Sequence, residues 1–134
     1  MTAKEYMKQA KILLRRIDRK QKEADALRQK LSVPQSPDFS DMPKTVSPEP
    51  NEIEIGVAKI ISLEEEVHTA EKELEKLKND FQMAILTITD TEYRDILTKR
   101  YLEFKDWSIV AEEMGYSEPS CYRLHREALF LMKS

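Results

Sequence analysis

The sequence predicts an all-α protein, in which a long antiparallel helical hairpin or coiled coil is joined to a C-terminal three-helix unit with a helix-turn-helix. Three observations lead to this prediction. Charged residues make up 35% of the 134 residues and glycine occurs only twice, which suits long solvated helices better than a turn-rich sheet protein. Two long segments repeat apolar residues at spacings of three and four. Helix caps and a glycine corner then follow in the C-terminal part of the chain.

These patterns divide the chain into four parts. We expect an N-terminal basic helix at 1–31, a proline-rich linker at 32–51, a long heptad-patterned helix at 52–88 and a helix-turn-helix DNA-binding domain at 89–134. The linker holds five of the six prolines, each of which excludes helix at its own position and disfavours it just before. We therefore expect the linker to be extended or disordered.

The first helix is predicted from an a/d seam in which Lys20 is the polar interruption. Nothing between Ala3 and Lys30 breaks a helix. Ten Lys and Arg residues against four acidic ones make the segment basic. The apolar seam positions are Tyr6, Ala10, Leu13, Ile17, Ala24, Leu27 and Leu31.

The second long helix gives the strongest periodic signal in the sequence. A seam of this length must bury against another helix. Residues 32–86 hold five basic and twelve acidic residues, so the two helices would attract each other, either within one chain or across a homodimer. The sequence leaves both arrangements open. The seam consists of Ile53, Gly56, Ile60, Leu63, Val67, Ala70, Leu74, Leu77, Phe81, Ala84 and Ile88.

A third helix is predicted to begin at a capping box, Thr89-x-x-Glu92, and to continue through Phe104. Asp106 is then expected to cap a short helix. Trp107 is the first residue of this helix and is expected to be a core residue or a lid on the three-helix unit. The side chains predicted to continue the third helix are Tyr93, Ile96, Leu97, Arg100, Tyr101 and Phe104.

The corner of the helix-turn-helix is predicted at Gly115, which supplies a positive φ. Ser117 caps the second helix of the motif, and Pro119 falls in its first turn, where a missing N–H costs nothing. Such a motif needs a small residue at the helix crossing and apolar residues that clamp the second helix. These are expected to be Ala111, Cys121, Leu124, Ala128 and Leu131.

The N-terminal part of the second helix in such a motif contacts base edges in the major groove. Arg123 can bond guanine bidentately, Glu118 can accept from cytosine N4, and Ser120 can bond a base or a phosphate. The alternative for the arginines is an exposed face that is simply solvated. Phosphate contacts are expected from Tyr122, His125 and Arg126 on the same helix and from Lys99, Arg100 and Lys105 before the motif.

The run EYRDILTKRYLEFKDWSIVAEEMGYSEPSCYRLHREAL resembles the C-terminal half of small phage and prophage transcriptional regulators of the ArpU-like type. The strongest marks are Arg100 and Tyr101, the W…A…MGYS pattern from Trp107 to Ser117, and YRLH…AL from Tyr122. These regulators are in turn similar to region four of the primary sigma factors. The resemblance implies a helix-turn-helix that binds promoter DNA and a regulator that contacts RNA polymerase.

From its sequence, we expect that the protein is not an enzyme. No nucleophile and base are paired, no glycine-rich phosphate loop is present, and no zinc-ligand spacing occurs, so we expect no catalytic residue, no metal and no cofactor. We expect His68 to be a solvated helix residue and Cys121 a small core residue. The single cysteine and the lack of a long apolar run or a signal-peptide pattern predict a cytoplasmic protein without a membrane partner.

The expected function is sequence-specific binding of double-stranded DNA by a regulator of phage or prophage genes. The expected partners are duplex DNA, a second copy of the chain through the coiled coil, and RNA polymerase. The net charge of −3 supports an alternative, a coiled-coil adaptor whose helix-turn-helix binds protein. A DNA-packaging component like a small terminase is a further alternative, because it too joins a helix-turn-helix to an oligomerising helix.

Overall fold

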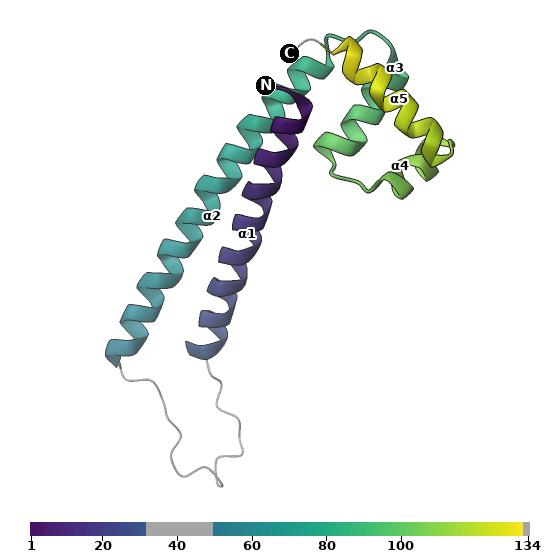
Figure 1. The fold of residues 1–134 in the computed structure, drawn as a ribbon. Helices are drawn as coiled ribbons and strands as arrows, with labels where there is room; N and C mark the ends of the chain where they lie inside the picture. The colour runs from purple at the N-terminus through teal and green to yellow at the C-terminus, as the bar shows by residue number, and fades with distance from the viewer. Residues whose placement is uncertain (32–49, 133–134) are drawn as a thin grey trace. The chain divides into compact units, whose positions relative to one another are not determined.

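The computed structural model describes residues 1–31 and 50–132 (Figure 1). The described residues form helices joined by short turns, without any strand, which confirms the all-α prediction. Most of the predicted linker lies outside them. The elements are α1 (Ala3–Leu31), α2 (Pro50–Ile85), α3 (Thr91–Leu97), the π-helical turn η2 (Thr98–Leu102), α4 (Trp107–Met114) and α5 (Glu118–Leu131).

The chain divides into two compact units, and the first of these, Leu13–Glu73, is a helical hairpin. Here α1 and α2 run antiparallel within one chain (Figure 1). The heptad prediction is confirmed along most of this seam, where residues at spacings of three and four are buried or half-buried. Ile17, Leu27 and Leu31 are the half-buried ones, and Ile53 departs from the prediction because its side chain is 39% exposed. The buried seam residues of this unit are Leu13, Ala24, Gly56, Ile60, Leu63, Val67 and Ala70.

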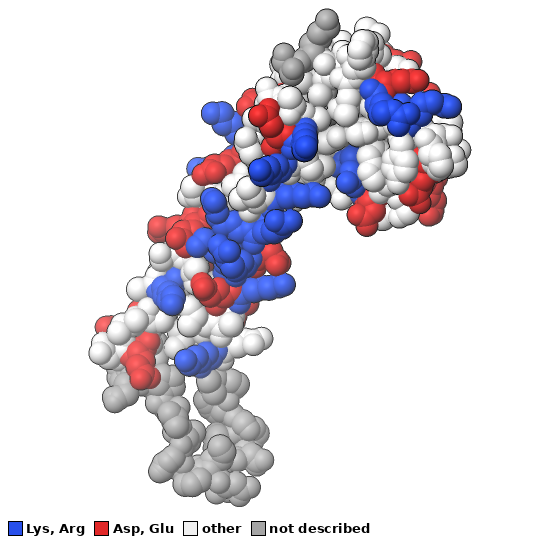
Figure 2. Space-filling model, viewed as in Figure 1, with Lys and Arg blue, Asp and Glu red and all other residues white. Residues whose placement is uncertain are grey.

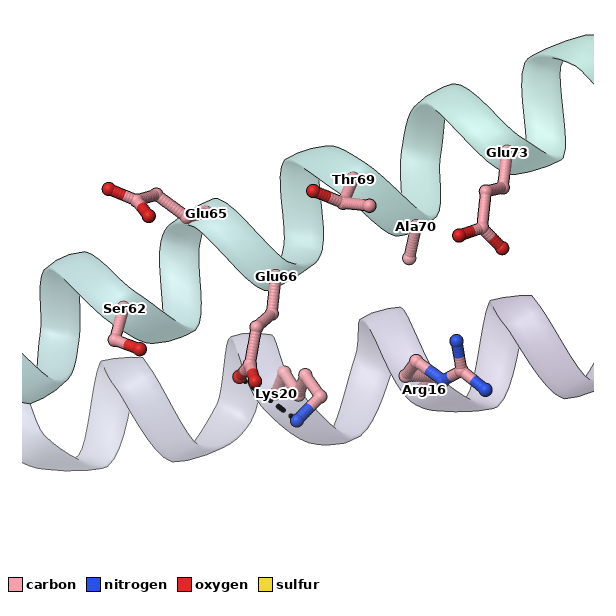
Figure 3. A pocket seen from close by; sticks show the side chains of 8 residues that line it. All are labelled: Arg16, Lys20, Ser62, Glu65, Glu66, Thr69, Ala70 and Glu73. Carbon is pink, nitrogen blue, oxygen red and sulfur yellow. Dashed lines mark hydrogen bonds and ion pairs between the residues drawn. The ribbon is translucent and has the colours of Figure 1, made fainter.

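Lys20, the polar residue in the seam of α1, is accommodated by an ion pair across the hairpin. Its Nζ lies 3.0 Å from Glu66 of α2, and its side chain is 22% exposed. Figure 3 shows the hollow that these two residues line together with Arg16 and Glu73. Arg28 pairs in the same way with Glu64. The opposite charges of the two helices therefore meet at the edges of an apolar seam.

We predict that Lys20→Leu stabilises the hairpin by about 1 kcal/mol, because burial of a leucine at a seam position outweighs the loss of one partly exposed ion pair. Urea unfolding followed by circular dichroism measures this change. Lys22→Leu is the matched control, since Lys22 points to solvent with 77% of its side chain exposed. Equal effects of the two substitutions would contradict the placement of Lys20 in the seam.

The second unit contains Met1–Ile12 and Leu74–Ser134. Its core joins the first turns of α1 to the last turns of α2 and to η2. Tyr6 is fully buried, its ring stacks on Phe81 at 4.2 Å between centroids, and its hydroxyl donates to the backbone oxygen of Tyr101 at 2.7 Å. Phe81 and Tyr101 also contact each other, with centroids 5.1 Å apart. Within this unit, the aromatic cluster joins the first turns of α1 and the last turns of α2 to η2.

Several helix boundaries differ from the predicted ones. Asp90, and not Thr89, caps α3, because its carboxylate accepts from the backbone N–H groups of Glu92 and Tyr93 at 2.8 and 3.3 Å. The third helix also does not continue regularly through Phe104. It widens into η2, and Phe104 then adopts a left-handed conformation with φ of 56°. The predicted helix at 52–88 begins two residues earlier and ends at Ile85.

The long helices of the described residues are rich in charge. None of the helices in the described part of the chain combines the length and the apolar character needed to cross a membrane.

Candidate nucleic-acid interface

The corner between α4 and α5 has the predicted geometry. Gly115 ends α4 with φ of 76°, and its N–H bonds the carbonyl oxygens of Ala111 and Glu112. The N–H of Tyr116 also bonds the oxygen of Ala111, at 3.0 Å. No heavy atom lies within 4 Å of where a Cβ of residue 115 would be, so the backbone conformation alone favours glycine here.

The N-termini of α5 and α4 begin at the residues that the sequence predicts, with one difference in how they are capped. The side chain of Ser117 accepts from the backbone N–H of Ser120, and Pro119 falls in the first turn of α5. Asp106 occupies the N-cap position of α4, but its side chain makes no capping bond. Its backbone oxygen instead accepts from Ile109 and Val110, each at 3.0 Å. The corner is thus fixed mainly by Gly115 and Ser117.

Small side chains allow α4 and α5 to cross closely. Ala111 is 6% exposed, and Val110, Cys121 and Ala128 are fully buried. Burial raises the pKa of the Cys121 thiol, so this side chain stays neutral at physiological pH and packs as a small apolar group. Leu131 differs from the prediction, because 46% of it is exposed at the end of α5. The crossing therefore depends on the first three turns of α5.

The face of α5 opposite this crossing holds the predicted base-reading residues. Arg123 and Arg126 are exposed, and neither pairs with another side chain in the part of the chain that the structure describes. Glu118 accepts from the hydroxyl of Tyr122 at 3.0 Å, one turn along the helix. Ser120 accepts from the Ser117 hydroxyl at 3.0 Å. Two guanidinium groups without an ion-pair partner among the described residues and one oriented carboxylate thus belong to the same helix.

The three basic residues predicted before the motif are held inside the domain. Lys99 and Lys105 both pair with Glu113, at 2.9 and 2.8 Å. These bonds lower the pKa of Glu113, with Lys105 as the larger cause, and bonds to Glu103 and Glu113 raise the pKa of Lys105. The lysines therefore stabilise the loop before α4, and their contact with phosphates stays a prediction.

Arg100 is also engaged within the domain. Its guanidinium donates to the backbone oxygen of Lys105 at 2.9 Å and lies 4.9 Å from the ring centroid of Trp107. Trp107 in turn contacts the ring of Tyr122 edge-on, with centroids 5.3 Å apart. Trp107 thus lies between the Arg100 guanidinium and the rings of α5, as the predicted lid residue.

For His125, which was predicted to contact phosphate, the structure shows a packing role. A hydrogen bond of 2.7 Å joins its Nε2 to Tyr101 Oη, and its ring contacts Trp107 at 4.8 Å between centroids. Burial lowers the pKa of His125 to about 4, and Arg100 and Arg126 add to this shift. The imidazole is therefore neutral at pH 7 and offers no positive charge to a phosphate.

Sequence reasoning did not foresee that Tyr6, Tyr101 and His125 belong to one cluster. Tyr6 and Tyr101 are 95 residues apart, and each fits its own helix without reference to the other. The sequence holds one signal that could have pointed to it, since Tyr6 and Phe81 are the two aromatic residues at the seam positions of the long helices. Among the described residues, no group of three or more His, Cys, Asp or Glu side chains could hold a metal ion.

Comparison with known proteins gives one match. The model of a family described as "Protein of unknown function (DUF1492)" matches residues 54–133, which include most of α2 and all of the C-terminal helices. No curated protein and no solved structure matches the chain. Since the matched segment is more than half of the sequence, the chain belongs to the DUF1492 family.

Proposed function

We propose that this protein is a cytoplasmic transcriptional regulator of phage or prophage genes that binds double-stranded DNA sequence-specifically through α5. The observation that supports the proposal best is the helix-turn-helix itself. The helix α5 is capped, has 14 residues and crosses α4 closely. Its outer face exposes two arginines that pair with no other side chain in the described part of the chain. A major groove about 12 Å wide admits such a helix.

In this proposal the N-terminal half of α5 reads base edges. Arg123 lies near the start of the helix and can donate two parallel hydrogen bonds to O6 and N7 of guanine. Glu118, oriented by its bond from Tyr122, can accept from the N4 amino group of cytosine. Arg126 lies one turn further along and can pair with a backbone phosphate.

Homodimerisation and contact with RNA polymerase are further parts of the proposal. The seams of α1 and α2 are buried against each other within one chain, so a dimer would need another surface or an exchange of helices. On α2, Ile53, Val57 and Ile61 follow one another at spacings of four and are 39%, 45% and 51% exposed. Light scattering of the purified chain would give its oligomeric state directly.

One observation favours an alternative function, a protein-binding adaptor. Phe130 is 88% exposed, and it lines a shallow and largely apolar pocket together with Tyr93 and Leu131. An exposed aromatic residue at the rim of such a pocket is typical of a protein-binding surface. The acidic net charge of the chain is also unusual for a DNA-binding protein.

Selection from random-sequence duplex DNA at two salt concentrations tests the proposal. We predict an enriched motif, for which Arg123→Ala weakens binding by roughly 5-fold to 150-fold and relaxes the preference at one base pair. Arg123→Lys keeps the charge but loses the bidentate fork, so it should relax the preference with a smaller loss of affinity. Arg126→Ala should weaken binding to all sequences alike.

Lys72→Ala serves as the control, because Lys72 is an exposed residue of α2, away from the helix-turn-helix. If no motif is enriched, and duplex DNA is not bound even at low salt, α5 is not a DNA-reading helix. The adaptor function would then be the better explanation of the exposed Phe130.

A further inference from the structure

Six basic residues of α1 lie on the side of the helix opposite its buried seam. At 3.6 residues per turn they fall within an arc of about 80°, and they extend over about 27 Å of the helix. All six are exposed, whereas Tyr6, Ala10 and Leu13 on the opposite side are buried. We call them the basic stripe: Lys4, Lys8, Lys11, Arg15, Arg19 and Lys22.

The basic stripe is not neutralised by the acidic residues of the described chain. Within the described ranges 1–31 and 50–132, Lys22 is the one member of the stripe that forms an ion pair, with Asp18 on the same helix. Other basic residues of the protein do pair with carboxylates, among them Lys20, Lys99 and Lys105. Figure 2 shows Lys and Arg side chains gathered along α1, although the chain as a whole has a net charge of −3.

This arrangement costs helix stability. Like charges three or four residues apart on a helix repel each other. The stripe contains five such pairs in succession, because its consecutive members are spaced by four, three, four, four and three residues. A set of like charges that weakens its own helix suggests a ligand of opposite charge that offsets the repulsion.

We propose that the basic stripe binds the phosphate backbone of duplex DNA. This inference rests on the proposed function, to which it adds a second, sequence-independent contact surface. A duplex presents one negative charge per about 1.7 Å of its axis, so a straight row of cations several turns long can pair with successive phosphates. Lys and Arg side chains on an exposed helix face are flexible enough to follow the backbone.

DNA fits the basic stripe better than an anionic membrane does. A helix that lies in a membrane surface inserts an apolar face between the lipid headgroups. The apolar face of α1 is already used within the protein, because Tyr6, Ala10 and Ala24 are fully buried. The stripe itself is made of charged side chains, which contact phosphates without insertion.

The test compares two triple variants of the full chain with equal changes in net charge. The stripe variant is Lys4→Gln/Lys8→Gln/Lys11→Gln. The control is Lys59→Gln/Lys72→Gln/Lys76→Gln, which replaces three exposed lysines of α2. The dissociation constant for a random-sequence duplex is measured between 50 and 200 mM salt, and circular dichroism checks that each variant keeps its helix content.

Each phosphate contact contributes about 0.9 to the slope of log affinity against log salt concentration, so loss of three contacts lowers the slope by about 2.7. Across this fourfold salt range, the wild type should therefore lose about 40-fold more affinity than the stripe variant. The control should have the slope of the wild type.

The outcomes separate this inference from the proposed function. A motif that depends on Arg123, with an unchanged slope in the stripe variant, would overturn the basic stripe as a DNA surface and leave the proposed function intact. Binding of random duplex that depends on the stripe, without any enriched motif, would support the inference and refute sequence-specific reading. Binding to vesicles containing phosphatidylserine, without binding to duplex DNA, would overturn both.

Discussion

Replacement of Tyr6 by alanine is expected to lower the free energy of unfolding by about 3–5 kcal/mol, the range for loss of a buried aromatic side chain. Tyr6 is fully buried and stacks on Phe81. Its hydroxyl also provides a hydrogen bond to the backbone oxygen of Tyr101. The substitution therefore leaves a cavity between α1, α2 and η2 and removes the donor for a carbonyl group in η2.

Urea unfolding monitored by circular dichroism measures this loss, and two further variants divide it. Tyr6→Phe keeps the ring and removes only the hydrogen bond, so it should cost about 1 kcal/mol. Ile12→Ala is the control on the same helix, because Ile12 is 45% exposed and should change stability by no more than about 0.5 kcal/mol. If Tyr6→Ala is as mild as Ile12→Ala, the start of α1 does not pack on this cluster.

The features that could be predicted from the sequence are those encoded by residues close together in the chain. A heptad seam is a repeat within one helix, and it specifies the buried face of α1 and α2 before any partner is known. Gly115 and Ser117 affect only the backbone close to them in the chain. Gly115 ends α4 in a left-handed conformation, and Ser117 caps the start of α5. Their local chemistry leaves little choice, and the structure agrees with the predicted conformation at both.

The features that could not be predicted depend on contacts between distant segments. Tyr101 was expected to continue a regular helix, yet its backbone oxygen accepts from Tyr6 and its hydroxyl bonds His125. These contacts coincide with the π-helical turn and the left-handed Phe104, which no short sequence pattern marks. Near the cap of α3, Asp90 outcompetes Thr89 because its carboxylate reaches two backbone N–H groups at once.

The same distinction applies to the candidate interface. Exposure of Arg123 and Arg126 follows from helical periodicity, because both lie opposite Cys121 and Ala128. The pairing of Lys99 and Lys105 with Glu113 does not follow from helical periodicity, because it requires the segment before α4 to fold back on that helix. A count of basic residues near a motif therefore overestimates the number available for phosphates.

The pH dependence of stability offers a second large effect, centred on His125. Burial lowers its pKa from the ordinary value of 6.5 to about 4, and the neighbouring guanidinium groups of Arg100 and Arg126 also disfavour the protonated ring. Between pH 6.5 and 4 the unfolded chain thus binds more protons at this residue than the folded chain. Stability must fall as the pH drops through this window, and the loss is complete near pH 4.

With allowance for the partial exposure of the ring, His125 should account for a loss of about 1–2 kcal/mol between pH 7 and pH 5. The lowered pKa values of Glu5 and Glu113 act in a different window, because their contribution is lost only below the ordinary carboxylate pKa of 4.5. Urea unfolding of the wild type and of His125→Gln at both pH values isolates the histidine.

The variant should be less stable than the wild type at pH 7 but should lose less stability on acidification, because glutamine does not titrate. His68→Gln replaces the other histidine, an exposed residue of α2, and serves as the control substitution. Parallel pH profiles for the wild type and His125→Gln would show that the imidazole is solvated in the folded protein. That result would also remove the argument that His125 is neutral, and the residue would again be a candidate for phosphate contact beside Arg126.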